Sequence, residues 1–291
     1  MGIGHRKVDI GALGLHVAST GSGDPVVLVH GWPEFWATWE PVMQRVGDSL
    51  HLIAPDLRGF GESDKPDPGP SDQVGADVHA DDMIALLDAL SIEKAGFVGH
   101  DVGAYVLQSL ARRYPQRIER LLFFNCPTAQ VGERWREASH INQVWYQTFH
   151  QMPFAASLVG ASRDSCRAYI GHFLKHWSHK KDAFDAVLER WVDNFMIPGN
   201  LQGGFNWYLS ANKARIATMA GTLPLPAKIT VPARVVWGRH DPILKSEWAD
   251  VLEEAFEQVS IDFAEDCGHF VHFENPDRAA SEIRAFFGKG E

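Results

Sequence analysis

The sequence predicts an α/β fold built on a mostly parallel sheet flanked by helices, with a helical insertion. Uninterrupted apolar runs, such as residues 26–29 and 121–124, are typical of strands buried on both faces of a parallel sheet. Helical patterns separate these runs, and alternation of this kind predicts an α/β architecture. The 291 residues, 45% of them hydrophobic, suffice for one large domain or a domain with an insertion.

The first part of the chain supplies most of the predicted strands. Residues 8–17 alternate apolar and polar positions and contain two glycines, which predicts an antiparallel hairpin. The apolar run 26–29 and the run 51–54 predict buried strands, with a helix over 38–50 between them. Apolar side chains in residues 75–90 have the spacing of an amphipathic helix.

The pattern changes after residue 128 and later resumes. Residues 129–222 contain no continuous β run and are rich in tryptophan, histidine and phenylalanine, so we expect a helical cap over the sheet. Strands are then predicted at 233–237 and 259–263, followed by a closing helix at 276–287. The expected organisation is a core made of 1–128 and 223–291, with the cap of 129–222 inserted into it.

The composition argues against several classes of partner. The net charge is −10 and there is no basic stripe, which disfavours nucleic-acid binding. No segment has the apolar length of a signal peptide or a membrane span, so we expect a soluble cytoplasmic protein without a membrane partner. Its three cysteines are widely spaced, which favours buried free thiols. A homo-oligomer is possible, and the pattern does not decide the oligomeric state.

The stretch Gly99-His100-Asp101-Val102-Gly103 lies between an apolar run and a helical pattern. Strand, sharp turn and helix are the context of the nucleophile elbow, in which small residues let the central side chain project above the sheet. The N-terminus of the following helix favours an ionised carboxylate at Asp101, which could act as a nucleophile. The alternative is an ordinary loop in which Asp101 caps the helix.

Two later strand ends carry further reactive residues. Asp241 follows the run 233–237, and His269 follows the run 259–263. The carboxyl ends of parallel strands meet at one edge of a sheet, so Asp101, Asp241 and His269 can come together there. Their order along the chain, nucleophile then acid then histidine, is that of the α/β-hydrolases.

Taken together, these motifs resemble the α/β-hydrolase superfamily, and within it the soluble epoxide hydrolases and the dehalogenases that use an aspartate nucleophile. The similar stretches are His30-Gly31-Trp32-Pro33, Asp56 to Ser63, Gly99-His100-Asp101, Gly238 to Asp241 and Asp266 to Phe270. The resemblance implies that Asp101 is the nucleophile, His269 the base and Asp241 its acid partner. It also implies an oxyanion hole made by the N–H groups of Trp32 and Val102, and it implies no metal or cofactor.

An aspartate nucleophile narrows the reaction. Attack of a carboxylate on a carbonyl would give an anhydride, whereas attack on a saturated carbon gives an ester. Water activated by His269 can then hydrolyse that ester, while Asp241 orients the imidazole and stabilises its protonated form. The expected partners are therefore a small apolar epoxide or halide, and water.

Five positions distinguish an epoxide from a halide as the substrate. Tyrosine, with a pKa near about 10, can donate a proton to a departing alkoxide. Tyr146 and Tyr208 lie in stretches similar to the two cap tyrosine motifs of the epoxide hydrolases. Val102 and Tyr105 stand where fluoroacetate dehalogenases have arginines, and Asn125 stands where many dehalogenases have the triad acid. These differences favour an epoxide hydrolase.

Other aromatic residues of the cap are expected to form the walls of the substrate pocket, and His100 and His150 are expected to be structural. The expected pocket residues are Trp145, Phe149, Phe205 and Trp207. The alternatives are a haloalkane or haloacid dehalogenase with the same nucleophile, and a hydrolase-fold protein that binds a small molecule without catalysis.

Overall fold

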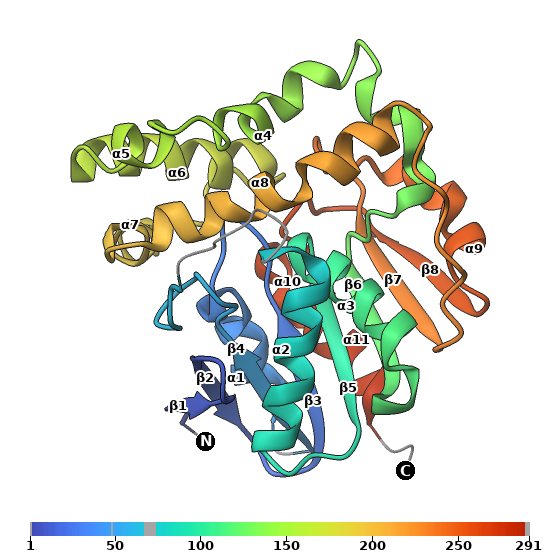
Figure 1. Ribbon diagram of the computed structural model, residues 1–291. Helices are drawn as coiled ribbons and strands as arrows, with labels where there is room; N and C mark the ends of the chain where they lie inside the picture. Colours follow the sequence, from blue (N-terminus) through green and yellow to red (C-terminus); the bar gives the residue numbers. More distant parts are fainter. Residues whose placement is uncertain (1, 48, 67–73, 289–291) are drawn as a thin grey trace.

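An eight-stranded sheet with helices on both faces forms the centre of the molecule (Figure 1). The computed structural model describes residues 2–47, 49–66 and 74–288. The strand order is β1-β2-β4-β3-β5-β6-β7-β8; β1 and β2 pair antiparallel, as do β2 and β4, and the remaining neighbours are parallel. The strands are β1 (Gly4–Asp9), β2 (Gly14–Thr20), β3 (Asp24–Val29), β4 (Leu50–Pro55), β5 (Ala95–His100), β6 (Ile118–Phe124), β7 (Ala233–Gly238) and β8 (Val259–Ala264).

The predicted strands are all present, and the hairpin is formed by β1 and β2. The helix expected over 38–50 is shorter than predicted. A 3₁₀ turn over Trp36–Trp39 leads into α1 (Glu40–Val46), which ends at Gly47 with a φ of 78°, a conformation that favours glycine. Position 48 of that prediction lies outside the described residues.

Helices cover both faces of the sheet (Figure 1). The helices α2 (Ala76–Ala89) and α3 (Val102–Arg113) pack side by side on one face. On the other face, α1 packs against the closing helix α11 (Pro276–Phe287). Short helices α9 (Leu252–Ala255) and α10 (Val271–Glu274) complete the core. Strands covered on both sides have no polar face, which explains their continuous apolar runs.

Between β6 and β7 the chain forms helices that lie above the carboxyl edge of the sheet (Figure 1). We call α4 to α8 the inserted helices. They are α4 (Trp145–Phe149), α5 (Ala155–Val159), α6 (Arg163–Trp177), α7 (Leu188–Met196) and α8 (Asn200–Met219). Two 3₁₀ segments, η4 (Ala129–Arg136) and η5 (Ile141–Val144), precede them.

Aromatic side chains join the inserted helices to the sheet. Trp32, which follows β3, is fully buried and contacts the rings of Tyr146, Phe173, Trp177 and Tyr208. Burial of such large side chains stabilises this junction by several kcal/mol, at roughly 25 cal/mol per Å² of apolar surface. The junction therefore holds the inserted helices directly above the strand ends.

Two sequence-based expectations concern the whole chain. The three cysteines are buried and none forms a disulfide, as predicted. Across the part of the chain that the structure describes, every helix is too short or too polar to span a lipid bilayer.

Candidate active site

Asp101 lies in the sharp turn between β5 and α3. Its φ of 51° and ψ of −112° are unusual for a residue with a side chain, and neighbouring glycines make the turn possible. A Cβ on Gly103 would lie 2.2 Å from the carbonyl oxygen of Val29, and one on Gly31 would lie 2.5 Å from Cβ of Asp101. The Asp101 carboxylate consequently projects above the carboxyl edge of the sheet.

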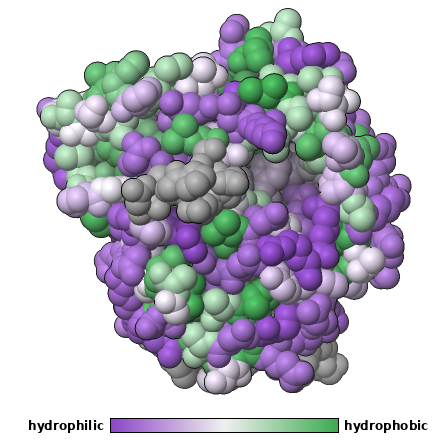
Figure 2. Space-filling model, viewed as in Figure 1, coloured by the Kyte–Doolittle hydropathy of each residue, from purple (hydrophilic) through white to green (hydrophobic). Residues whose placement is uncertain are grey.

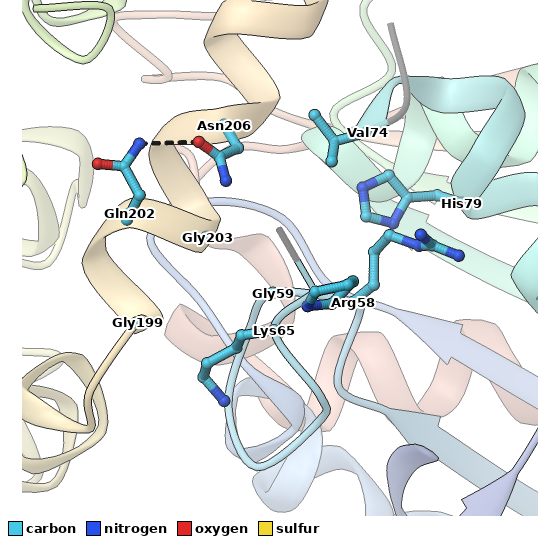
Figure 3. Close-up of a pocket in the computed structure, with 10 residues that line it drawn as sticks. Arg58, Gly59, Lys65, Val74, His79, Gly199, Gln202, Gly203 and Asn206 are labelled. Atoms are coloured by element: carbon cyan, nitrogen blue, oxygen red, sulfur yellow. Dashed lines mark hydrogen bonds between the residues drawn. The ribbon is translucent and has the colours of Figure 1, made fainter. Parts of the chain in front are cut away.

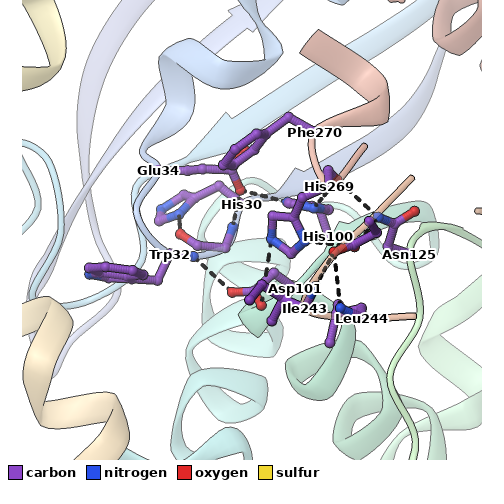
Figure 4. Close-up of polar contacts among 12 residues, drawn as sticks. His30, Trp32, Glu34, His100, Asp101, Asn125, Ile243, Leu244, His269 and Phe270 are labelled. Carbon is purple, nitrogen blue, oxygen red and sulfur yellow. Dashed lines mark hydrogen bonds and ion pairs between the residues drawn. The ribbon is translucent and has the colours of Figure 1, made fainter. Parts of the chain in front are cut away.

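The three predicted residues of the triad meet at this edge, and Figure 4 shows His269 beside Asp101. Nε2 of His269 lies 3.9 Å from Oδ2 of Asp101, and Nδ1 of His269 lies 2.8 Å from Oδ2 of Asp241. The His269 side chain is fully buried, whereas the Asp101 side chain is 13% exposed. Nε2 of His269 has no hydrogen-bond partner. This nitrogen is therefore available to a molecule bound next to Asp101.

Besides His269, three N–H donors hold Asp241. Its Oδ1 accepts from the backbone N–H groups of Ile243 (2.8 Å) and Leu244 (3.0 Å), and its Oδ2 accepts from Nδ2 of Asn125 (2.5 Å). Oδ1 of Asn125 in turn accepts from the backbone N–H of Gly238. In the sequence alone, Asn125 is notable only because it is not a carboxylate. Its amide in fact fixes the acid that comes from β7.

The charges around His269 determine its basicity. Burial lowers its pKa, but the carboxylate of Asp241, the hydrogen bond to that carboxylate, and the charges of Asp101 and Glu34 together raise the pKa to about 9. The imidazolium form is thus favoured while these groups are ionised.

The predicted oxyanion residues flank Asp101. The backbone N–H of Trp32 donates to Oδ1 of Asp101 at 3.0 Å (Figure 4). Val102 directly follows Asp101 as the first residue of α3 and is buried. The Trp32–Pro33 peptide bond is cis.

Tyr146 on α4 and Tyr208 on α8 lie beside each other over this site. Their rings are 5.6 Å apart, and the Tyr146 ring stacks on Trp32 at 5.5 Å. Burial raises the pKa of Tyr146 well above its usual value, and the Asp101 charge adds to this effect. Burial also raises the pKa of Tyr208, as do Tyr146 and Asp101. Both hydroxyls therefore stay protonated at neutral pH.

Two of the four expected pocket residues lie elsewhere. Trp145 is 46% exposed, and with Phe149 it lines an apolar cavity of about 480 Å³ between α4, α5 and α6. Apolar residues also gather on the surface over α5 and α6 (Figure 2). In α4, Tyr146 is buried against Trp32, whereas Trp145 is nearly half exposed, and this arrangement places Trp145 and Phe149 along the outer cavity.

The other two expected pocket residues are buried. Phe205 stacks on His150 at 3.9 Å, and His150 also contacts Trp32 and Tyr208. Trp207 faces Tyr105 of α3, whose pKa is raised by burial and by the Asp101 charge. Tyr105 is therefore a further residue close to the carboxylate.

A second cavity, of about 180 Å³, lies between α8 and the loop that follows β4 (Figure 3). Its walls include Arg58, Lys65 and His79, and Nε2 of Gln202 donates to Oδ1 of Asn206 at 2.8 Å. None of Asp101, Asp241 and His269 lines either of these two cavities.

Trp177, at the end of α6, was not singled out from the sequence. Its ring lies 5.0 Å from that of His269, and its carbonyl accepts from the backbone N–H of His269 at 2.9 Å. No local pattern distinguishes Trp177 from the other tryptophans, because its contact with His269 bridges two segments far apart in the sequence.

The comparison with known families agrees with this arrangement. A family model described as alpha/beta hydrolase fold matches residues 24–276. The chain belongs to this family.

The hydrolase is 30% identical over 289 residues to the AB hydrolase superfamily protein YfhM of Bacillus subtilis, and 94% of each chain is covered. It is 28% identical over 294 residues to a soluble epoxide hydrolase of Corynebacterium sp., with 98% of this chain and 97% of that protein covered. Among solved structures, it is similar to the epoxide hydrolase CorEH without ligand, with a TM-score of 0.82 and 25% identity. That match covers 98% of this chain and 99% of the CorEH chain.

The hydrolase also has a buried polar cluster next to the triad. Glu34, His100 and His272 place three possible metal-ligand atoms within 4.8 Å of one another. In the structure these atoms hydrogen bond to each other: Glu34 lies 2.7 Å from Nδ1 of His100 and 2.9 Å from Nε2 of His272. The distances are those of hydrogen bonds between a carboxylate and imidazoles.

Proposed function

We propose that this hydrolase converts an epoxide and water to a vicinal diol through an ester on Asp101. One observation carries the proposal. Two buried tyrosines, Tyr146 and Tyr208, stand together over a carboxylate that also faces an unpartnered imidazole nitrogen. This combination supplies a nucleophile, acids for the leaving oxygen and a base for water.

In the first step, Asp101 would attack a ring carbon of the epoxide. A C–O bond forms between the carboxylate and that carbon, the ring C–O bond breaks, and its electron pair goes to the epoxide oxygen. Tyr146 or Tyr208 donates the proton that this oxygen requires. The N–H of Trp32 binds Oδ1 of Asp101, so Oδ2 would make the attack.

In the second step, His269 would activate water. Ester formation removes the negative charge of Asp101, which is one of the charges that raise the pKa of His269. The imidazole can then return its proton to the tyrosine that gave one up in the first step, and it can take another proton from water. Hydroxide adds to the ester carbon, and the N–H groups of Trp32 and Val102 bind the oxyanion. When the oxyanion collapses, the alkoxide of the diol leaves with the proton that His269 took from water, and the carboxylic acid on Asp101 then gives its proton to His269.

The surroundings support a small apolar epoxide as the substrate, because the side chains above Asp101 are mainly aromatic. Trp32, Tyr146, Trp177 and Tyr208 are all less than a tenth exposed. Residues 129–222 would act as the cap that excludes bulk water from the ester. The relative named a soluble epoxide hydrolase supports the same reaction.

The His269→Gln variant tests the proposal directly. It should form the ester without hydrolysing it, so its intact mass should rise by the whole mass of styrene oxide. The control is the double variant Asp101→Ala with His269→Gln, which should gain no mass.

A parallel reaction with 1,2-dibromoethane separates the epoxide hydrolase from a dehalogenase. An adduct from the bromide alone, together with released bromide, would move the assignment to a dehalogenase. No adduct from either compound would contradict an alkylating Asp101.

A further inference from the structure

The hydroxyl of Tyr146 has a polar neighbour on its own helix, the side chain of Gln147. Nε2 of Gln147 donates to the hydroxyl oxygen of Tyr146 at 3.5 Å, and Oε1 of Gln147 accepts from Nη1 of Arg215 on α8 at 3.5 Å. Gln147 is buried. Its amide therefore connects the guanidinium of Arg215 with the hydroxyl of Tyr146.

Arg215 fixes the orientation of this amide. A guanidinium has donors and no acceptor, so the Gln147 atom that faces Arg215 must be the amide oxygen. The amide N–H then faces Tyr146 and donates to its oxygen. The hydroxyl proton of Tyr146 is consequently free for another acceptor, such as the oxygen of an epoxide bound next to Asp101.

Arg215 is half-buried and, among the residues that the structure describes, no carboxylate forms an ion pair with it. Nη2 donates to Oδ1 of Asn212 at 2.9 Å, and Nε is buried without a hydrogen-bond partner. Burial lowers the pKa of Arg215, whereas an ionised Tyr146 raises it. A guanidinium stays charged at neutral pH, so its positive charge attracts negative charge at Tyr146.

Tyr208 has different surroundings. Burial raises its pKa, and so do Tyr146, Asp101 and Tyr169. At Tyr146, burial and the Asp101 charge also raise the pKa, but the hydrogen bond from Gln147 lowers it. Gln147 thus favours the ionised form of Tyr146, whereas these neighbours of Tyr208 favour its neutral form.

We propose that Gln147 and Arg215 stabilise the ionised form of Tyr146 during ring opening, a role that rests on the proposed function. Tyr146 is then the acid, and Tyr208 keeps its proton and hydrogen bonds to the epoxide oxygen. When Tyr146 gives its proton to that oxygen, the electron pair of the O–H bond stays on the phenolic oxygen, which accepts from Gln147. Gln147 and Arg215 are positioning residues, because both act through Tyr146.

Ring opening moves negative charge towards Arg215. The charge is on Asp101 before the attack and on Tyr146 after it, and Tyr146 is the one of these two groups whose charge acts on Arg215. A fixed positive charge behind Tyr146 stabilises the later distribution more than the earlier one, which lowers the barrier. The two contacts of 3.5 Å are long for hydrogen bonds, and such contacts shorten as charge develops.

The rate of Asp101 alkylation by styrene oxide, followed by intact mass in the His269→Gln background, tests this role. Arg215→Met should slow alkylation about tenfold, because methionine keeps much of the bulk and removes the charge. Arg215→Lys should keep the rate within about threefold of the parent, because the charge remains. Gln147→Met should slow alkylation about tenfold, because it removes the donor to Tyr146.

Two further backgrounds distinguish this role from a general effect on structure. Arg215→Met should slow alkylation about tenfold in the Tyr208→Phe background, where Tyr146 remains the acid. It should slow alkylation by less than about twofold in the Tyr146→Phe background, because no tyrosinate forms there. Equal slowing in the two backgrounds, or no slowing in either, would overturn the role.

Lys213→Met is the matched control, because Lys213 is an exposed cation on the same helix. It should leave the alkylation rate unchanged, and a loss equal to that of Arg215→Met would contradict the proposal. If the His269→Gln parent formed no ester with any epoxide, the proposed function would fail and this role with it. An ester formed equally fast with and without the charge of Arg215 would exclude this role alone.

Discussion

At the scale of single residues, the proposed ring opening depends on two tyrosines. Tyr146 and Tyr208 come from different helices and meet over Asp101. Their raised pKa values keep them protonated through the pH range in which the carboxylate is ionised. A protonated hydroxyl can donate its proton to a departing alkoxide, whereas a departing halide requires no proton.

We therefore expect Tyr146→Phe and Tyr208→Phe each to slow alkylation by roughly 10- to 100-fold, since each removes one donor to the epoxide oxygen. The double variant should lose nearly all ring opening. The measurement is the rate of adduct formation by intact mass in the His269→Gln background.

The control for these variants is Tyr114→Phe. Tyr114 lies at the end of α3 and donates to Asp81, away from the triad. An unchanged alkylation rate in both active-site variants would assign the protonation to another group, such as Tyr105.

At the scale of elements, the turn between β5 and α3 depends on close backbone approach. A methyl group at Gly103 would lie within 2.2 Å of the Val29 carbonyl oxygen, which is backbone of the neighbouring strand and has little freedom to move. The turn and the strand therefore have to fit without a side chain at this position.

Gly103→Ala should lower the free energy of unfolding by more than about 3 kcal/mol, or yield no folded protein, because α3 must shift away from β3. Urea unfolding followed by circular dichroism measures the effect. A folded variant with wild-type stability would disprove the steric argument.

Gly171→Ala in α6 is the matched control. Its new Cβ would lie 3.5 Å from Leu188, an ordinary contact, and alanine favours the helix. This variant should gain about 0.5 to 1 kcal/mol.

At the scale of the whole molecule, buried histidines govern the response to acid. Burial lowers the pKa of His79 to about 3 and that of His272 to about 4. In the unfolded chain both would take up protons near the ordinary histidine pKa of 6.5. The unfolded state thus binds more protons below that pH, and stability decreases as the pH falls from about 6.5 towards 4.

Between about pH 6.5 and about pH 5, each such histidine should lower the free energy of unfolding by about 2 kcal/mol. Urea unfolding of wild type and His79→Asn at both pH values measures the contribution of His79. The variant should show a smaller decrease than wild type, and equal decreases would exclude His79 as a source of acid sensitivity.

His269 acts in a different pH range. Its pKa is raised to about 9 in the folded state, so the stability it contributes is complete below about 6.5 and is lost as the pH rises through 9. The titration of His269 therefore does not change the free energies of unfolding that are compared at acidic pH.

The sequence determined the parts of this protein that depend on local pattern. The continuous apolar runs predicted the inner strands of the parallel sheet, because strands buried on both faces have no polar side. The edge strand β8 was predicted from a run that alternates apolar and polar residues. The glycines around Asp101 predicted its turn, and the order of strand ends predicted that Asp101, Asp241 and His269 could meet. These inferences depend on neighbours in the chain and on one general property of parallel sheets.

The tertiary structure decided what depends on contacts between distant segments. It showed that Asn125 supports Asp241, that Trp177 lies against His269, and that Trp145 and Phe149 line an outer cavity. Sequence spacing does not specify how short helices rotate or which buried groups pair across the core. The cluster around Glu34 is the clearest example. Glu34 and His100 are 66 residues apart in the sequence, and the packing of the core brings them together.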